Sequence, residues 1–169
     1  MKILGVDLST NYCGLFVIED SINNFTAELI NISKIPFFDR SNKIFNSFIK
    51  NFDKHDLIIV REENLLNFKY GRSNKKGLIN LIKIGTLFDY NCYKQNYNLY
   101  TYNVLHARKI AGFKRIKGID TKSQIDIFIK NNYINIYDYI HHRFNKKFDD
   151  INDAFILALA YFNDNRSKF

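Results

Sequence analysis

The sequence predicts an α/β fold in which a mixed five-stranded sheet carries helices on both faces. Two observations lead to this expectation. Three strand-like segments with close returns come first, which favours an antiparallel meander. Helical and strand-like segments then alternate towards the end of the chain. With 169 residues, 46% of them hydrophobic, the chain is long enough to bury one core, so residues 1–169 are expected to form a single domain.

The expected strands are short apolar runs between turn signals. The first run, residues 2–7, is apolar from Ile3 to Val6, ends in Asp7 and is followed by the turn residues Ser9-Thr10-Asn11. The run at residues 26–32 alternates in part between apolar and polar residues, as a half-buried strand does. The remaining strands are expected at residues 13–18, 26–32, 56–61 and 100–104.

Apolar residues at helical spacing predict the helices. In the first of them, Ile44, Phe45, Phe48, Ile49 and Phe52 fall on one face. Residues 71–77, bounded by two glycines, are expected to form a loop. The helices are expected at residues 44–52, 78–88, 125–132 and 151–162. This order of elements is similar to that of an RNase H-like domain.

The charge of the chain limits its partners. A net charge of +8 favours a polyanionic partner, either nucleic acid or an acidic membrane surface. No apolar run approaches the roughly 20 residues of a membrane-spanning helix, and the N-terminus becomes acidic too soon for a signal peptide. Cys13 and Cys92 lack ligand spacing and are expected to be free thiols in a reducing compartment. We therefore expect a cytoplasmic protein that is not bound to a membrane.

Four acidic residues stand where a packed core makes carboxylates costly. Asp7 closes the first apolar run, Glu62 follows the fourth, and Asp150 and Asp153 lie three apart at the head of the last helix. Such carboxylates need a positive partner, and their oxygens suit Mg²⁺ or Mn²⁺. Residues at i and i+3 share one helix face. If that helix crosses the strands, all four side chains converge on a site for two metal ions.

Ordinary structural interpretations exist for each acid. Asp7 is compatible with a turn after a strand, and Glu62 with a solvated strand end. Asp150 and Asp153 are compatible with acids that a helix dipole favours near its N-terminus. The occurrence of all four, in order, on the expected elements favours the metal site.

The residues resemble the RuvC-like Holliday junction resolvases of the RNase H/integrase superfamily, over nearly the whole chain. The opening segment 3–10, with Gly14 after it, looks like the first-strand motif, and Asp150-Ile151-Asn152-Asp153-Ala154 looks like the D-x-x-D-A terminal helix. Lys122-Ser123-Gln124-Ile125 resembles the K-x-Q-V helix start. Residues 62–68 look most like those of short phage and viral members. The resemblance implies an endodeoxyribonuclease that cuts four-way junctions by paired nicks, in a bacterial or virus-infected cell.

Two positions of the site have alternatives. Glu62 lies nearer the end of the apolar run and is the preferred ligand over Glu63, and Asp149 is an alternative ligand beside Asp150. Typical family members carry an aromatic residue three positions after the glutamate. Here Leu65 stands there, and Phe68 comes later. The expected cofactor is a pair of Mg²⁺ ions, for which Mn²⁺ can substitute.

Basic stretches supply candidate contacts to DNA phosphates. One stretch follows the glutamate and includes two aromatic residues able to stack on exposed bases. Lys122, near a helix start where a cation is unfavourable, is a candidate for the scissile phosphate, with codon bias as the competing explanation. The remaining candidates are Phe68, Lys69, Tyr70, Arg72, Lys75, Lys76, Arg108, Lys109, Lys114 and Arg115.

A four-way junction has approximate two-fold symmetry, so two matched nicks favour a homodimer. Helix 78–88, in which Gly85 permits close approach, is the expected interface, and a purely intramolecular packing role is equally compatible. Alternatives to the resolvase are a related nuclease acting on flaps, other branched DNA or RNA, and an inactive nucleic-acid-binding module. An actin-like kinase shares the first-strand pattern, but 169 residues are too few for its two lobes.

Overall fold

The structure is a computed structural model that describes residues 1–63, 75–144 and 148–166. Its centre is a five-stranded sheet with the order β3-β2-β1-β4-β5. The first three strands form an antiparallel meander, and the last two run parallel to β1. The strands are β1 (Lys2–Leu8), β2 (Tyr12–Glu19), β3 (Ser21–Asn31), β4 (Leu57–Glu62) and β5 (Asn98–Tyr102). The predicted mixed five-stranded sheet is thereby confirmed.

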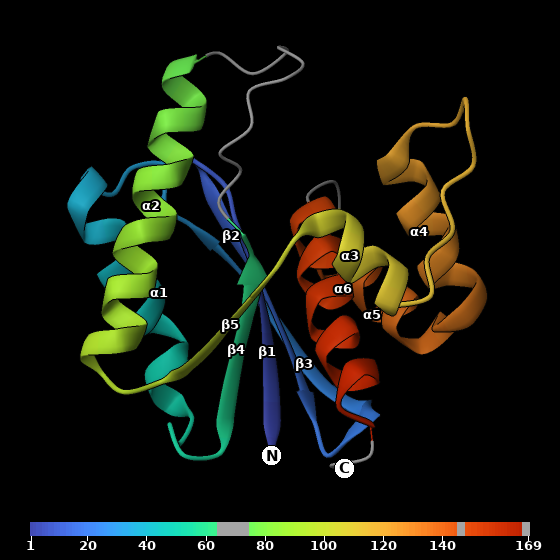
Figure 1. Ribbon diagram of the computed structural model, residues 1–169, viewed down its shortest axis with the longest axis horizontal. Coiled ribbons are helices and arrows are strands. Elements are labelled where there is room, and N and C mark those ends of the chain that lie inside the picture. Colours follow the sequence, from blue (N-terminus) through green and yellow to red (C-terminus); the bar gives the residue numbers. More distant parts are fainter. Residues whose placement is uncertain (64–74, 145–147, 167–169) are drawn as a thin grey trace.

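Helices cover both faces of the sheet, as expected (Figure 1). One face carries α1 (Arg40–Ser47) and α2 (Lys75–Lys94), with the short 3₁₀ turns η1 (Phe37–Asp39) and η2 (Ile49–Asn51) beside α1. The other face carries four helices, of which the last lies directly on the strands. These are α3 (Val104–Ile110), α4 (Thr121–Asn132), α5 (Ile134–Phe144) and α6 (Asp149–Asp164). Among the described residues, no helix is long and apolar enough to cross a membrane.

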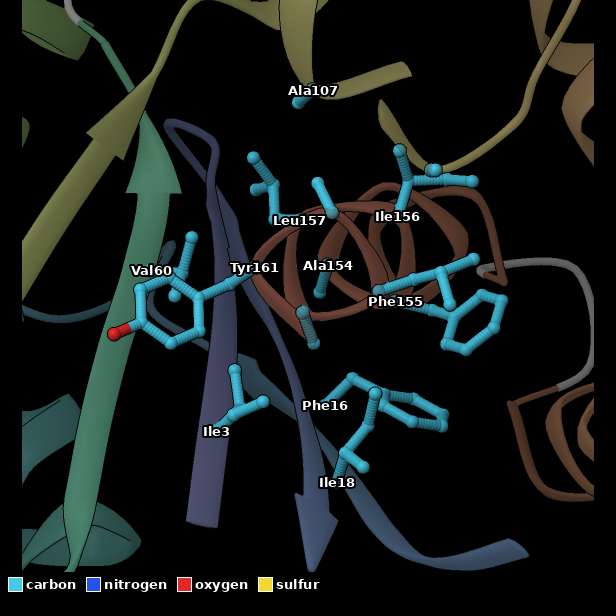
Figure 2. Close-up of a cluster of buried hydrophobic side chains, with 14 of the residues drawn as sticks. Ile3, Phe16, Ile18, Val60, Ala107, Ala154, Phe155, Ile156, Leu157 and Tyr161 are labelled. Carbon is cyan, nitrogen blue, oxygen red and sulfur yellow. The ribbon is translucent and has the colours of Figure 1, made fainter. Parts of the chain in front are cut away.

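Each strand serves two separate cores because successive side chains point to opposite faces. Ile3 and Val60 pack into the cluster beneath α6, whereas Leu4 and Ile59 pack into the cluster under α1 and α2. Figure 2 shows the first cluster, in which the strands contribute from below and α3 closes over the far side of α6. Helix α6 is therefore buried between the sheet and α3, which fixes its position on the strands.

Two glycines allow α6 to lie directly on the sheet. A Cβ added at Gly5 would stand 1.9 Å from the carbonyl oxygen of Ala154, and one added at Gly14 would stand 2.2 Å from that of Asp150. Both distances are far below any van der Waals contact, so only glycine fits at these positions. The backbone of α6 thus rests on β1 and β2 without intervening side chains.

The structure contains elements that the periodicity did not predict. Helix α3 occupies residues that were partly expected as the end of a strand, and α5 lies where no element was expected. Asn103 caps α3 by accepting a hydrogen bond from the Leu105 backbone N–H at 3.0 Å. Lys75, Lys76 and Gly77 form the first turn of α2, so the expected loop over 71–77 was wrong for these three residues.

Candidate active site

The strand register places Asp7 beside Glu62. Strands β1 and β4 run parallel, with Val6 opposite Arg61. The next residue of each strand is one of the two acids, so both lie at the carboxyl ends of these neighbouring strands. Alternation along the strands puts Asp7 on the side of Gly5 and Glu62 on the side of Val60, which is the side covered by α6. Both carboxylates therefore lie under the N-terminal part of α6.

Helix α6 adds its own two acids because its first turn crosses β2 at Gly14. Gly14 is the register partner of Asp7, and the main chain of Asp150 lies against it. Asp150 is therefore held beside Asp7. Asp153 follows one turn later on the same helix face, towards β4. The structure brings together the four acids that the sequence singled out.

Burial raises the pKa of all four carboxyls, and repulsion between neighbouring acids adds to the rise. The pKa of the Asp7 carboxyl lies well above its usual range. Burial is the main cause, followed by repulsion from Asp153, Asp150 and Glu62. Burial also raises the pKa values of Glu62, Asp150 and Asp153. Repulsion from Asp153 adds to the rise at Glu62, while Arg108 opposes it. A cation placed among these groups would relieve both the repulsion and the burial of charge.

Two basic side chains approach this group from α3 and α4. Arg108 forms an ion pair with Asp153 at 3.3 Å. Its buried Nε is without a hydrogen-bond partner in the described part of the chain. Lys122, in the first turn of α4, pairs with Asp149 at 2.9 Å and is largely exposed. Arg108, which was expected at a DNA phosphate, thus points towards the four carboxylates. Lys122 lies at the rim of that group.

The donor set fits divalent cations by its chemistry, though not yet by a closed geometry. Carboxylate oxygens are the ligands that Mg²⁺ and Mn²⁺ take in proteins. Within residues 1–63, 75–144 and 148–166, no three Asp, Glu, His or Cys side chains are grouped tightly enough to hold a metal ion as they stand. Asp7, Glu62, Asp150 and Asp153 are the residues that would hold it, and burial raises the pKa of each of their carboxyls.

The two alternative ligands lie further from the group. Glu63 is exposed, and alternation along the chain places it opposite to Glu62. Its backbone N–H donates to the Tyr102 carbonyl at 2.8 Å, which continues the pairing with β5. The Asp149 carboxylate is turned towards Lys122. Glu62 and Asp150 are therefore the better-placed members of each pair.

The remaining DNA-binding candidates fall into three groups. Lys109, Lys114 and Arg115 are exposed on α3 and on the segment that follows it. Lys75 and Lys76 begin α2, and Lys76 is exposed. Phe68, Lys69, Tyr70 and Arg72 lie outside the described residues.

Sequence periodicity missed one residue that supports the site. Arg61 is buried at the end of β4, where it forms an ion pair with Asp89 of α2 and donates to the carbonyl oxygen of Glu62. It thereby ties the strand end that carries Glu62 to the helix on the opposite face. An arginine inside an apolar strand run was the available signal, since a buried guanidinium requires a partner.

Comparison with known proteins places this arrangement of elements in a known fold. No family model and no curated protein sequence matches the chain. Among solved structures, Thermus thermophilus RuvC in complex with a Holliday junction substrate superposes with a TM-score of 0.65 at 12% identity, covering 99% of this chain and 96% of that one. The chain has a RuvC-like fold. The same fold relates it to a fowlpox virus resolvase, solved with substrate Holliday junction DNA (TM-score 0.58, 18% identity, 97% and 98% covered).

The RuvC-like fold also includes the yeast mitochondrial Holliday junction resolvase, with a TM-score of 0.63, 13% identity, and coverage of 95% of this chain and 77% of that one. All three comparisons cover this chain from end to end, so the meander, the parallel strands and the terminal helix are shared together. At 12–18% identity the likeness establishes the fold. The resemblance of the motifs to RuvC-like proteins is thus matched by the architecture.

The raised pKa of Asp7 predicts an inverse dependence of stability on pH in a chelating buffer. The unfolded chain loses this proton near pH 4, whereas the folded protein retains it to a higher pH. The folded state therefore binds more protons above pH 4, and the free energy of unfolding should fall as the pH rises through the folded-state pKa. Denaturant titrations at pH 5 and pH 7.5 with a chelator measure this fall.

Added Mg²⁺ should raise the free energy of unfolding at pH 7.5 again. The expected increase is about 2.7 kcal/mol at a hundredfold excess of Mg²⁺ over its dissociation constant. The matched variant is Asp7→Asn, which should show a smaller pH dependence and a smaller response to Mg²⁺. Equal pH profiles for the wild type and the variant would contradict the predicted role of Asp7.

Proposed function

We propose that this protein is a metal-dependent, structure-specific endodeoxyribonuclease that resolves four-way DNA junctions by paired symmetric nicks. The observation that carries the proposal is the convergence of Asp7, Glu62, Asp150 and Asp153 at one edge of the sheet. It occurs in a chain of net charge +8 with a RuvC-like fold. The solved RuvC and fowlpox virus structures that share this fold hold Holliday junction substrates, which supports the choice of substrate.

The residues divide the work by position and charge. When bound, two Mg²⁺ ions would activate the attacking water and stabilise the leaving 3′ oxygen of the phosphodiester. The four carboxylates would hold the ions at the carboxyl ends of β1 and β4, where burial under α6 strengthens each electrostatic contact. Lys122, exposed at the rim, is positioned to meet the phosphate. Arg108, beside Asp153, would supply a second positive contact to the substrate phosphate.

The decisive experiment is a nicking assay on a synthetic four-way junction labelled on each strand in turn. With Mg²⁺ or Mn²⁺, the wild-type protein should cut two opposing strands at symmetric positions, and with a chelator it should cut none. A panel of flap, three-way, duplex and RNA substrates decides the substrate class. Preferred cutting of flaps or RNA, or cutting that survives chelation, would overturn the proposal.

Paired nicks require two sites, and helix α2 offers a surface for a second copy of the chain. The C-terminal half of α2 is buried against the sheet through Ile84, Phe88 and Cys92. Its N-terminal half carries the aliphatic residue Ile79, which is 45% exposed. Leu78, Leu81 and Ile82 are only half-buried around a hollow at the ends of β1 and β4. We propose that this half of α2 is the homodimer interface.

Replacing Ile79 with glutamate should shift the protein from dimer to monomer, because it places a charge in the apolar contact. Sedimentation velocity at micromolar concentration measures the mass. Tyr93→Glu is the matched control, since Tyr93 is 80% exposed at the other end of the same helix and should leave the dimer intact. A monomeric wild type, or a dimer unaffected by Ile79→Glu, would exclude this interface.

A further inference from the structure

The segment between α3 and α4 presents an apolar residue to solvent among cations. Ile116 is 59% exposed and Ile119 is 45% exposed. Lys114, Arg115 and Lys117 are exposed beside them. We refer to residues 113–119 as the basic loop. Single exposed isoleucines are common on protein surfaces, but here two of them lie three residues apart among three cations, which offers a combined apolar and basic contact to a partner.

The basic loop is held in one shape although its tip faces solvent. Gln124 of α4 is buried and binds the loop backbone three times. Its side-chain oxygen accepts from the Ile116 N–H at 2.7 Å, and its Nε2 donates to the carbonyls of Ile116 at 2.8 Å and Ile119 at 2.7 Å. A buried amide with these partners fixes the backbone that carries Ile116.

Both ends of the basic loop are anchored as well. Phe113 is buried, and its ring packs edge-on against Phe128 at 5.9 Å. Gly112 and Gly118 adopt φ values of 89° and 91°, which set the turns into and near the end of the loop. The Asp120 side chain then caps α4 by accepting from the Ser123 N–H at 3.0 Å. The apolar tip is therefore pre-organised before any partner binds.

The basic loop leads into α4, whose first turn lies at the carboxylate site. Lys122, two residues after the Asp120 cap, already reaches Asp149 at the start of α6. Figure 1 shows the segment between α3 and α4 rising at the same end of the molecule as the carboxyl end of β4 and the N-terminal end of α6. DNA bound at the carboxylates would reach this loop where it extends past the start of α4.

We propose that the basic loop is a branch-point wedge, in which Ile116 inserts between unstacked bases while Lys114, Arg115 and Lys117 hold the flanking phosphates. The inference rests on the proposed function and adds the residue that distinguishes a branched substrate from a duplex. An aliphatic side chain that inserts between stacked bases costs about a few kcal/mol in unstacking, and a junction centre, where stacking is interrupted, lowers that cost. Phosphate contacts hold the DNA in register without regard to its branching.

Binding measured without cutting tests the proposal. The protein is titrated, in a chelating buffer, into a four-way junction and into a duplex of equal length, with 2-aminopurine at the junction centre. The wild type should bind the junction more tightly and raise the 2-aminopurine fluorescence. Ile116→Ser should weaken junction binding about tenfold, the loss expected of one isoleucine burial, leave duplex binding unchanged, and abolish the fluorescence rise.

Matched variants separate the loop from its surroundings. Ile134→Ser changes an isoleucine that is 51% exposed at the start of α5 and should behave as wild type. Lys114→Gln should weaken junction and duplex binding alike and lower the salt dependence by about one counterion. Gln124→Met keeps the buried volume but removes the three hydrogen bonds. It should reduce the junction preference although Ile116 is intact.

The outcomes are distinguishable. If the wild type binds junction and duplex equally, the proposed function fails and the wedge falls with it. If the wild type prefers the junction and Ile116→Ser retains both the preference and the fluorescence rise, only the wedge is overturned. An equal loss on both DNAs would assign Ile116 to general DNA contact and also overturn it.

Discussion

Replacing Asp7 with asparagine is expected to lower the rate of junction nicking by about a thousandfold or more, the scale on which loss of a pre-organised electrostatic group acts. Asp7 lies where β1, β4 and α6 meet, and its carboxyl interacts with each of the other three acids. Asparagine keeps the size of the side chain but removes the charge that would hold the cations. Single-turnover nicking with saturating protein measures the effect.

Junction binding by Asp7→Asn should remain at the wild-type level or become tighter, because the substitution removes a negative charge facing the phosphates. Asp164→Asn is the matched control. It changes an exposed carboxylate at the opposite end of α6, and this carboxylate accepts a hydrogen bond from the Tyr102 hydroxyl. That variant should cut normally. Wild-type cutting by Asp7→Asn would refute the carboxylate mechanism.

Replacing Gly5 with alanine should be the most disruptive small substitution in the core. The new methyl group would stand 1.9 Å from the Ala154 carbonyl oxygen and 2.9 Å from the Ala158 nitrogen. Both atoms belong to the backbone of α6, so the helix itself must move. Overpacking of this kind costs about 3 kcal/mol in the free energy of unfolding, and denaturant titration at constant pH would measure it.

The displacement should also impair nicking, since it moves Asp150 and Asp153 away from the strand ends. Gly77→Ala is the matched control, because a Cβ there meets no atom within 4 Å. It should instead stabilise α2 by about 0.5–1 kcal/mol, as alanine does relative to glycine inside a helix. A Gly5→Ala variant as stable as the wild type would show that α6 does not rest on β1 as described.

Some elements were predictable from local pattern and others were not. The strands and the last helix have continuous or strictly periodic apolar residues, so their type could be read from the chain. Helix α5 is rich in isoleucine, tyrosine and histidine, which favour strands or are neutral, and it is helical because Ile136 and Ile140 pack into the core beneath α6. Helix α3 is seven residues long, too short for a periodic signal, and in the structure it begins at the N-cap Asn103.

The candidate site was predictable in its members but not in its contacts. The position of Asp7, Glu62, Asp150 and Asp153 at element ends was visible along the chain. Nothing in their spacing indicated that Arg108 would turn from a phosphate-facing surface to Asp153. Such a pairing joins residues 45 positions apart, and it depends on where α3 packs on α6.

The sequence by itself determined which side chains share a face, because alternation in a strand and the 3.6-residue turn of a helix are properties of the local backbone. It therefore determined the sheet, the acids and the basic character of the chain. Only the tertiary structure decided that Gly5 and Gly14 let α6 settle on the strands, and that Gln124 fixes the backbone of Ile116. These are contacts between distant segments. They form only when the whole core is packed, since that packing provides the free energy that holds the segments together.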